Sequence, residues 1–312
     1  MPLGETLLRS LQRLTSAPHE ASGAERAGAL GEAMVAAALD ATEGMLVVPN
    51  PLIPHPRRPA AWLESDLLVY AHGKLFCIEV KNYRGRITYP PGDWTRTTAP
   101  SILQVKHGRY GERLDVKQHP HPLRKTTAFI YDLKRYLGNI DPRYARLYIN
   151  PVVVFGPQAD IDAVHDPAAG VIGIAEIERF LCYYGQPPNG WATPPFIAQM
   201  FGRIPSWDWV CTTRGEWHNG VLAQPGLCYT DRRGVQVCLP WGDLRAVSSQ
   251  PGSLFTDDTL TLQLRDGRRM EDLCRKGSVM LECGGHQQLY DLHHLREIVV
   301  NVSAMGMNVR NA

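Results

Sequence analysis

Asp66, Glu79 and Lys81 combine two carboxylates with one amine in a short stretch of the chain. Two carboxylates held close together repel each other and favour a cation between them. Mg²⁺ or Mn²⁺ accepts such oxygen ligands together with waters and phosphate oxygens. The ion polarises a phosphodiester and lowers the pKa of its bound water, and a nearby lysine can orient that water and stabilise negative charge. These residue types therefore indicate metal-dependent phosphodiester cleavage, provided that the fold brings them together.

A predicted β-hairpin would bring them together. Two apolar runs flank the loop Ala-His-Gly-Lys at residues 71–74, a pattern typical of a hairpin. If the two central loop residues form the turn, the numbers of facing residues add to 145, which places Asp66 opposite Glu79. Lys81 lies on the same face, because side chains alternate with period two. The backbone carbonyl of Val80 could supply a further metal ligand.

The same three residues would also fit an exposed hairpin that carries a solvated salt bridge. The opposite face of the hairpin argues against this alternative. Its residues Leu67, Val69, Ile78 and Val80 are all strongly apolar, which is typical of strands inside a sheet that is covered on both faces. Three charged residues inside such a sheet require a functional reason.

The elements around the hairpin follow from apolar periodicity and from turn residues. In chain order we predict a helix at residues 23–41, a short strand at 45–48 and the hairpin at 67–80. Residues 82–122 are expected to be irregular, with only short strand candidates. A second helix at 123–137, a buried strand at 148–155 and a third helix at 174–184 follow. Beyond these, short strands separated by turns are predicted at residues 220–222, 227–230, 235–239, 244–248 and 260–264. A helical pattern at residues 286–305 closes the chain.

Four segments are expected from this reading. They are an N-terminal helical extension at residues 1–22, a nuclease-like domain at 23–185, a Pro-rich linker at 186–205, and a small β-rich domain with a terminal helix at 206–312. The last segment weakly resembles small PH-like β-barrel domains of bacteria. Its arginines and one lysine could extend a phosphate-binding track, at Arg232, Arg233, Arg245, Arg265, Arg268, Arg269, Arg275 and Lys276.

Composition excludes several classes of protein. The 312 residues are 44% hydrophobic and 21% charged, as in soluble globular proteins. We find no apolar run long enough for a transmembrane helix and no signal peptide, so the expected location is the cytoplasm without membrane association. Seven cysteines without a CxxC pair argue against a disulfide framework or a zinc ribbon. No GxxxxGK[ST] loop is present, which argues against ATP-driven activity.

Three stretches of the chain resemble the NERD (nuclease-related) domain, a branch of the PD-(D/E)XK superfamily. They are Gly31-Glu32-x-x-Val35, Ser65-Asp66-Leu67-Leu68-Val69 and the run from Phe76 to Ile87, FCIEVKNYRGRI. The run is the most specific element, because the family pattern is an apolar strand, E-x-K, asparagine, an aromatic residue, any residue and glycine. The resemblance covers residues 23–140.

The resemblance implies an α/β fold with a restriction-endonuclease-like αβββαβ core, in which helices flank a mixed central sheet and the active site lies at one sheet edge. It makes Asp66 and Glu79 metal ligands and Lys81 the catalytic lysine. Glu32 matches a glutamate on the first helix that would bind a second ion or orient water. The alternatives are that Glu32 is an exposed helix residue, or that Glu25 takes its place in another helix register.

The chain departs from the family at residues 121–125, His-Pro-Leu-Arg-Lys, where members often carry Asn-Pro-x-x-Gln. Lys125 replaces the glutamine, and phosphate contact is one role for it. Basic residues also follow the hairpin at Arg84 and Arg86. We regard these three residues as candidate nucleic-acid contacts, although a solvated basic face would look the same in the sequence.

The expected substrate is nucleic acid, and the family resemblance specifies DNA, in repair or in defence against foreign DNA. The C-terminal domain could bind a protein partner, and a homodimer would be needed for double-strand cuts. The alternative function is a scaffold or adaptor that binds nucleic acid or a partner and is catalytically weak. The intact Asp66, Glu79 and Lys81 favour the enzyme.

Overall fold

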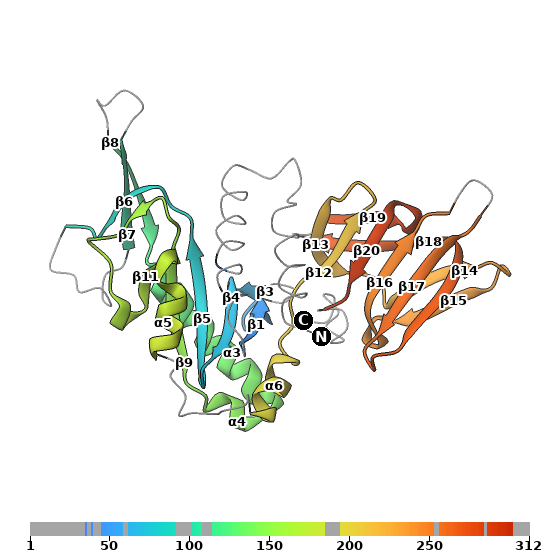
Figure 1. Ribbon diagram of the computed structural model, residues 1–312, viewed down its shortest axis with the longest axis horizontal. Coiled ribbons are helices and arrows are strands. Elements are labelled where there is room, and N and C mark those ends of the chain that lie inside the picture. Colours follow the sequence, from blue (N-terminus) through green and yellow to red (C-terminus); the bar gives the residue numbers. More distant parts are fainter. Residues whose placement is uncertain are drawn as a thin grey trace. The chain divides into compact units, whose positions relative to one another are not determined.

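The computed structural model describes residues 35, 39, 45–58, 62–91, 101–107, 114–184, 194–252, 256–283 and 286–301 (Figure 1). These residues fall into two compact units. The first contains the described residues up to Ile204 apart from 54–62, and the second contains residues 205–301 together with 54–58 and Trp62. The predicted extension at 1–22 lies outside the described residues. Of the helix predicted at 23–41, only Val35 and Leu39 are described, and both are helical.

A mixed five-stranded sheet forms the centre of the first unit. Its order is β1-β4-β5-β9-β11, with bounds Leu46–Pro49, Leu67–Ala71, Lys74–Lys81, Ile149–Phe155 and Val171–Gly173. Strands β1, β4 and β5 pair antiparallel, whereas β9 pairs parallel to both β5 and β11. The mixed α/β class and the predicted strands at 45–48 and 148–155 are confirmed.

The hairpin β4–β5 has the predicted register. Its turn residues His72 and Gly73 have φ angles of 47° and 83°, so both adopt the left-handed conformation that a two-residue type I′ turn requires. The ladder runs from Ala71 opposite Lys74 to Leu67 opposite Ile78. This short loop fixes which residues face each other along the whole hairpin.

Helices cover both faces of the sheet (Figure 1). Helix α3, Pro122–Ile140, packs its buried residues Phe129, Ile130, Leu133 and Leu137 against one face, and α5, Ile177–Tyr184, packs Phe180 and Leu181 against the other. Both helices were predicted, and α3 extends the predicted range by a few residues at its C-terminal end. The face under α3 carries Leu68, Tyr70, Leu75 and Cys77 and is therefore the face of Glu79.

A second sheet occupies much of the segment that was predicted to be irregular, and that prediction is wrong. The order is β10-β6-β7-β8, with bounds Ala159–Asp160, Gly85–Thr88, Ser101–His107 and Leu114–Pro120. Strand β8 reads Leu-Asp-Val-Lys-Gln-His-Pro, and its described side chains are mostly exposed. Because hydrogen bonds to β7 hold it rather than core burial, the sequence has no apolar alternation to reveal it.

Four short elements complete the first unit: α4, η1, η2 and α6, at Pro142–Ala145, Pro167–Ala169, Ile174–Glu176 and Pro195–Phe201. A pair of short strands, β2 at Leu52–Pro54 and β3 at Trp62–Glu64, lies where the chain passes between the residues of the two units. Helix α6 lies within the predicted linker at 186–205. Its residues Ile197 and Met200 pack in the same core as α3. The described part of that stretch is therefore a packed element and not a free linker. Pro195 at its first position is compatible with a helix start.

The second unit is built from strands β12 to β20, with bounds Asp208–Thr212, Trp217–Leu222, Gly226–Asp231, Gln236–Pro240, Leu244–Gln250, Asp258–Leu264, Arg269–Cys283, His286–Asp291 and Leu295–Val299. The order is β13-β12-β20-β16-β17-β18-β14-β15, and β19 pairs with β18. Because β13 also pairs with β18, six of the strands close a ring. Its interior is one apolar cluster that includes the buried Trp241. Short turns at Trp241–Asp243 (η3) and Leu292–His294 (η4) each precede a strand.

The helix predicted at 286–305 is wrong over residues 286–299. This stretch forms β19, η4 and β20 instead, and β20 pairs with both β12 and β16. The spacing of Leu289, Leu292 and Leu295 imitates a helical face, but the turn η4 between the two strands produces that spacing. The likeness to PH-like domains rested partly on the helix and stays a prediction. None of the described helices combines the length and apolarity needed to cross a membrane.

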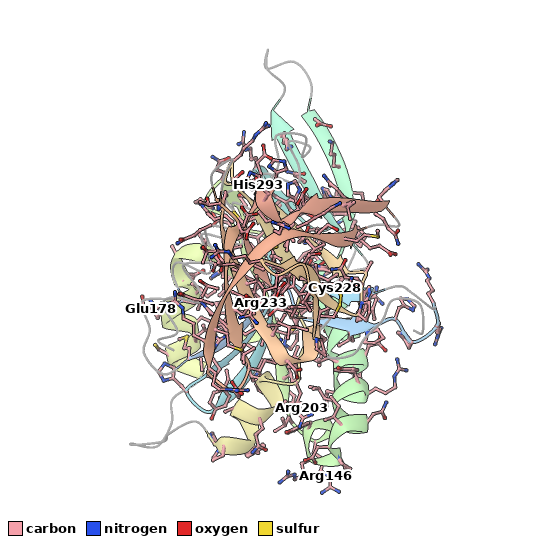
Figure 2. The ribbon with its side chains drawn as sticks, turned by 90° about the vertical axis from the view of Figure 1, so that its right-hand side faces the viewer. Arg146, Glu178, Arg203, Cys228, Arg233 and His293 are labelled. Carbon is pink, nitrogen blue, oxygen red and sulfur yellow. A yellow bond between two sulfur atoms is a disulfide. The ribbon has the colours of Figure 1, made fainter. Side chains whose placement is uncertain are left out.

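A disulfide joins Cys228, labelled in Figure 2, to Cys238. The two cysteines face each other across the β14–β15 pair. The count of seven cysteines argued against a disulfide framework, but it could not predict this single cross-strand bond, because the pairing depends on the hairpin register. Cys77, Cys182 and Cys274, whose side chains are also described, are free thiols.

Leu133 tests the packing of α3, which holds one wall of the candidate site. The side chain is fully buried between α3 and the central sheet. We expect Leu133→Ala to lower the free energy of unfolding by about 2–5 kcal/mol, because the change removes buried methyl groups and leaves a cavity. Urea denaturation measures the difference, with Lys74→Ala, at an exposed position on β5, as the control. A loss below about 0.5 kcal/mol would contradict this packing.

Candidate active site

The hairpin brings Asp66 and Glu79 together at the end of the sheet. The β4–β5 ladder ends at Leu67 opposite Ile78, and Asp66 lies one residue beyond it in the same register. The position of Asp66 is fixed from two sides. Its backbone carbonyl accepts a hydrogen bond of 2.8 Å from the amide of Asn50, and its Oδ2 accepts one of 2.6 Å from the amide of Val80.

Glu79 is a buried carboxylate that binds two lysines through one oxygen. Its side chain is 1% exposed. Oε1 accepts from Lys81 Nζ at 2.6 Å and from Lys125 Nζ at 2.7 Å. Lys81 is 22% exposed and Lys125 is 56% exposed, so the two ammonium groups approach Glu79 from the solvent side. Charge-assisted hydrogen bonds of this kind are needed to keep a carboxylate ionised at such a buried position.

The second carboxylate oxygen, Glu79 Oε2, is buried and accepts no hydrogen bond from the described residues. A buried oxygen without a donor is costly, and native proteins rarely keep one without a reason. Within the described part of the chain, no third histidine, cysteine or acidic side chain joins Asp66 and Glu79. Two carboxylates with a spare oxygen suit a hard divalent cation, which takes its other ligands from water, carbonyl and phosphate oxygens.

Electrostatics at Asp66 reflect the crowding of the two acids. Burial raises the pKa of its carboxyl from 3.8 to about 7, and the charge of Glu79 adds to the rise. Lys81, the amide of Val80 and Lys125 act in the opposite direction but do not offset it. Burial is the main cause because it disfavours the charged form, and a cation bound between the two acids would act in the opposite direction.

The orientation of Val80 bears on its predicted role as a carbonyl ligand. Its amide points to Asp66, on the side of β5 that β4 covers further along the hairpin. An extended residue directs its amide and its carbonyl to the same side of the strand. The ladder to β4 ends before Val80, so this carbonyl also points toward the Asp66 side.

An aromatic pair that the sequence did not reveal connects this centre to the second sheet. The ring of Tyr83 stacks on His119 with centroids 4.6 Å apart. Burial and then the charge of Glu79 raise the pKa of Tyr83. Burial followed by the charges of Lys117, Lys106 and Lys81 lowers the pKa of His119. The pair therefore lies between the acidic centre and the basic strands β7 and β8.

The candidate residues from the sequence differ in where they lie. Asp66, Glu79, Lys81 and Lys125 come together, the last across 46 positions of sequence. Arg84 and Arg86 are exposed on the segment that leaves β5, and no described contact links their side chains to Glu79. The backbone carbonyl of Arg84 accepts from Gln104 Nε2 at 2.9 Å, which ties the segment to β7.

Two predicted positions have no role that the described geometry could test. Glu32 lies outside the described residues, as does Glu25.

Cys77 lies on the same face as Glu79 but is fully buried, and its Sγ is 3.3 Å from Ser65 Oγ. Burial raises the pKa of this thiol to about 12. It is therefore a packing residue and not a nucleophile.

The raised pKa of Asp66 predicts a pH-dependent stability in the absence of metal. Because the pKa is higher in the folded than in the unfolded state, the free energy of unfolding falls as pH rises from about 4 through about 7. We expect Asp66→Asn to remove this fall and to be more stable than wild type at pH 8 in EDTA. Urea denaturation across that range measures it, with the exposed Asp162→Asn as control. Parallel pH profiles for wild type and Asp66→Asn would contradict the raised pKa.

Comparison with known families gives one match. Residues 27–156 match the nuclease-related domain model. The matched range contains Asp66, Glu79, Lys81 and Lys125 and ends one residue after β9. No curated protein matches the chain. This part of the chain is therefore similar to a nuclease-related domain, and it includes the hairpin, helix α3 and the acidic centre between them.

Proposed function

We propose that the chain is a divalent-metal-dependent phosphodiesterase that cleaves nucleic acid, with DNA as its expected substrate and a role in repair or in defence against foreign DNA. Glu79 carries the proposal. This carboxylate is buried opposite Asp66, with one oxygen bound to two lysines and the other without a described donor. A salt bridge that only stabilises a fold gains nothing from such burial.

The donor set fits Mg²⁺ or Mn²⁺. Asp66, Glu79 and the carbonyl of Val80 offer only oxygen atoms, which these ions prefer, and a bound cation would offset the burial that raises the pKa of Asp66. When bound, such an ion polarises a phosphodiester and lowers the pKa of coordinated water.

The lysines have different tasks in this proposal. Lys81 is the more enclosed of the two and lies on the strand that carries Glu79, so its ammonium is held rigidly where it can orient water and stabilise charge on a phosphate. Lys125 is more exposed and comes from helix α3, which gives it the freedom to release Glu79 and contact a phosphate of the incoming strand.

Basic residues near the centre support nucleic acid as the substrate. Lys106 and Lys117 are close enough to His119 to lower its pKa, which reports a positive potential beside the acidic centre. Arg84 and Arg86 are exposed at the start of β6, in the sheet that also contains β7 and β8. Contacts from such side chains to phosphates would be independent of sequence and weakened by salt.

One observation favours the alternative of a binding scaffold. Lys81 and Lys125 together already supply two positive charges to the single carboxylate of Glu79, as in a closed ion-pair network. In a scaffold these contacts would be permanent, and neither metal ions nor the loss of Lys81 would affect the bound nucleic acid. The orphan Oε2 and the raised pKa of Asp66 weigh against that reading.

Cleavage of supercoiled and linear DNA in Mg²⁺ or Mn²⁺ tests the proposal. We expect wild type to cleave in either metal but not in EDTA. Lys81→Ala and Asp66→Asn should each lower the rate by about 10²–10³-fold, because each removes a charged group that acts on the reacting phosphate. Lys74→Ala should cleave like wild type, because Lys74 is exposed at the opposite end of β5.

The scaffold would behave differently in the same assays. It would bind DNA without cutting it in either metal, and its affinity would be the same for wild type and Lys81→Ala. Equal cleavage by wild type and both active-site variants would also contradict the proposal, since the activity would then come from elsewhere.

A further inference from the structure

A notch in the edge of the central sheet lies beside the nuclease centre. Strand β9 runs from Ile149 to Phe155, but β11 pairs with it only from Val153 onward. Pro151 stands in the part without a β11 partner, where its missing amide costs no ladder hydrogen bond. Gly170 approaches the carbonyl of Pro151 so closely that a Cβ would lie 2.4 Å from the oxygen, and its φ of 78° also favours glycine.

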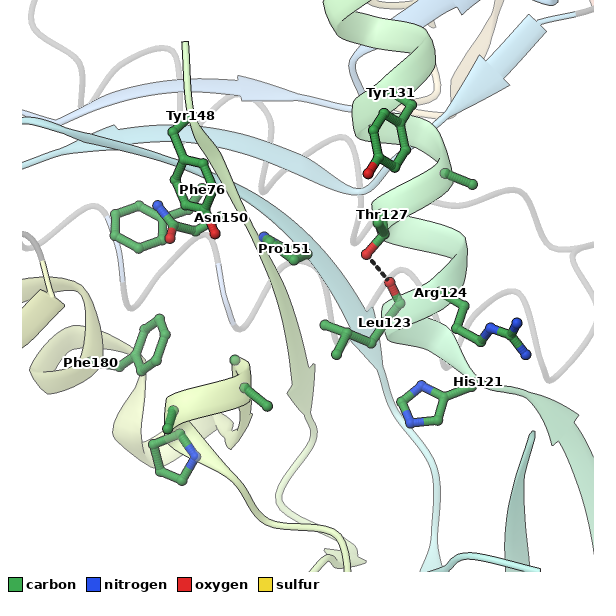
Figure 3. Close-up of a pocket in the computed structure, with 15 residues that line it drawn as sticks. Phe76, His121, Leu123, Arg124, Thr127, Tyr131, Tyr148, Asn150, Pro151 and Phe180 are labelled. Atoms are coloured by element: carbon green, nitrogen blue, oxygen red, sulfur yellow. Dashed lines mark hydrogen bonds between the residues drawn. The ribbon is translucent and has the colours of Figure 1, made fainter. Parts of the chain in front are cut away.

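A cavity of about 630 Å³ fills this notch (Figure 3). Helix α3 contributes Arg124, Thr127 and Tyr131 to its lining, β9 contributes Asn150, the residue before β9 contributes Tyr148, and α5 contributes Phe180. The volume lies within the range for sites that bind small molecules and cofactors. The lining is mostly apolar, with a few polar groups that come from α3, from the residue before it and from residues 148 and 150.

Aromatic side chains line both the buried and the exposed parts of the cavity. Phe76 and Phe180 are buried and meet with ring centroids 6.1 Å apart. Tyr131 and Tyr148 are instead 73% and 76% exposed. Two large rings that line the same cavity and are mostly exposed are available for contacts with a ligand. Planar faces of this kind are the platforms on which bases of single-stranded nucleic acid stack.

Polar groups in the cavity suit the edge and the backbone of a nucleotide. Asn150 Nδ2 donates to the carbonyl of Leu75 at 2.9 Å, which fixes the amide, and no described residue donates to its Oδ1. That oxygen is available to accept from an exocyclic amine or a ring N–H. Arg124 is exposed and could contact a phosphate.

The cavity and the nuclease centre share one turn of helix. Arg124 lines the cavity, and the next residue, Lys125, binds Glu79. A strand whose phosphate lies at Glu79 therefore has a neighbouring nucleotide within reach of this cavity.

We propose that the cavity binds an unpaired nucleobase of the substrate strand, stacked against Tyr131 and Tyr148. The inference rests on the proposed nuclease function for the source of the base, but it concerns binding and not catalysis. It assigns the chain a preference for strands with unpaired bases next to the cleaved phosphate.

Binding of a labelled single-stranded DNA in EDTA tests this proposal, with fluorescence anisotropy of the full chain as the readout. The matched probe is a strand of equal length that carries sugar and phosphate but no bases. We expect the double variant Tyr131→Ala/Tyr148→Ala to bind the normal strand on the order of tenfold more weakly than wild type does, and to bind the abasic strand equally well. Phenylalanine at both positions should retain most of the affinity, because stacking needs only the ring.

Tyr183→Ala is the control for a lost exposed tyrosine, since Tyr183 lies on α5, is 71% exposed and does not line the cavity. Thermal unfolding verifies that each variant folds. Equal affinity of wild type and the double variant for the normal strand would overturn the proposal, as would an equal loss for the normal and abasic strands. Displacement of the strand by dAMP at similar affinity would show that the ligand is a free nucleotide, which also overturns it.

The outcome is separable from that of the cleavage assay. Lys81→Ala should lose cleavage and keep the difference in affinity between normal and abasic strands. If wild type does not cleave but shows that difference, the nuclease proposal fails and the base-binding site stands.

Discussion

The burial of the Glu79 carboxylate is the constraint on which the first unit depends. A charge at this position requires compensation, because the interior of the sheet cannot solvate it. Lys81 supplies part of it locally, two residues along the same strand, and Lys125 supplies part from helix α3. Asp66 adds a second carboxylate, whose pKa rises mainly because it is buried and further because of the charge of Glu79. A divalent cation bound at the two carboxylates, as proposed, would offset this cost.

The surrounding fold keeps these groups in place. The type I′ turn sets the register that brings Asp66 opposite Glu79, and the parallel pairing of β5 with β9 covers the other edge of the strand. Helix α3 is held by apolar residues one to three turns beyond Lys125, so the geometry of the centre depends on core packing away from it. The same helix forms one wall of the cavity at the edge of β9. Catalytic and base-binding groups would thus be positioned by one rigid element.

Local patterns predicted what local geometry determines. The hairpin register follows from a two-residue loop, and α3 and β9 follow from apolar spacing, so Asp66, Glu79 and Lys81 could be placed together from the sequence alone. Strands held by backbone pairing, such as β8, carry no apolar alternation and were missed. The contact between Lys125 and Glu79, the stack of Tyr83 on His119 and the cavity join segments that are distant in sequence. Their geometry depends on how the sheets and helices pack, which no single segment encodes.

The central claim is that Asp66 and Glu79 form a binding site for one divalent cation. Electron paramagnetic resonance of added Mn²⁺ tests it directly, because bound and free Mn²⁺ give different signals and no substrate is needed. The account predicts saturable binding to wild type that Glu79→Gln abolishes and that Glu178→Gln, at an exposed position on α5, leaves unchanged. Glu79→Gln that binds Mn²⁺ as tightly as wild type, or wild type that binds none, would contradict it.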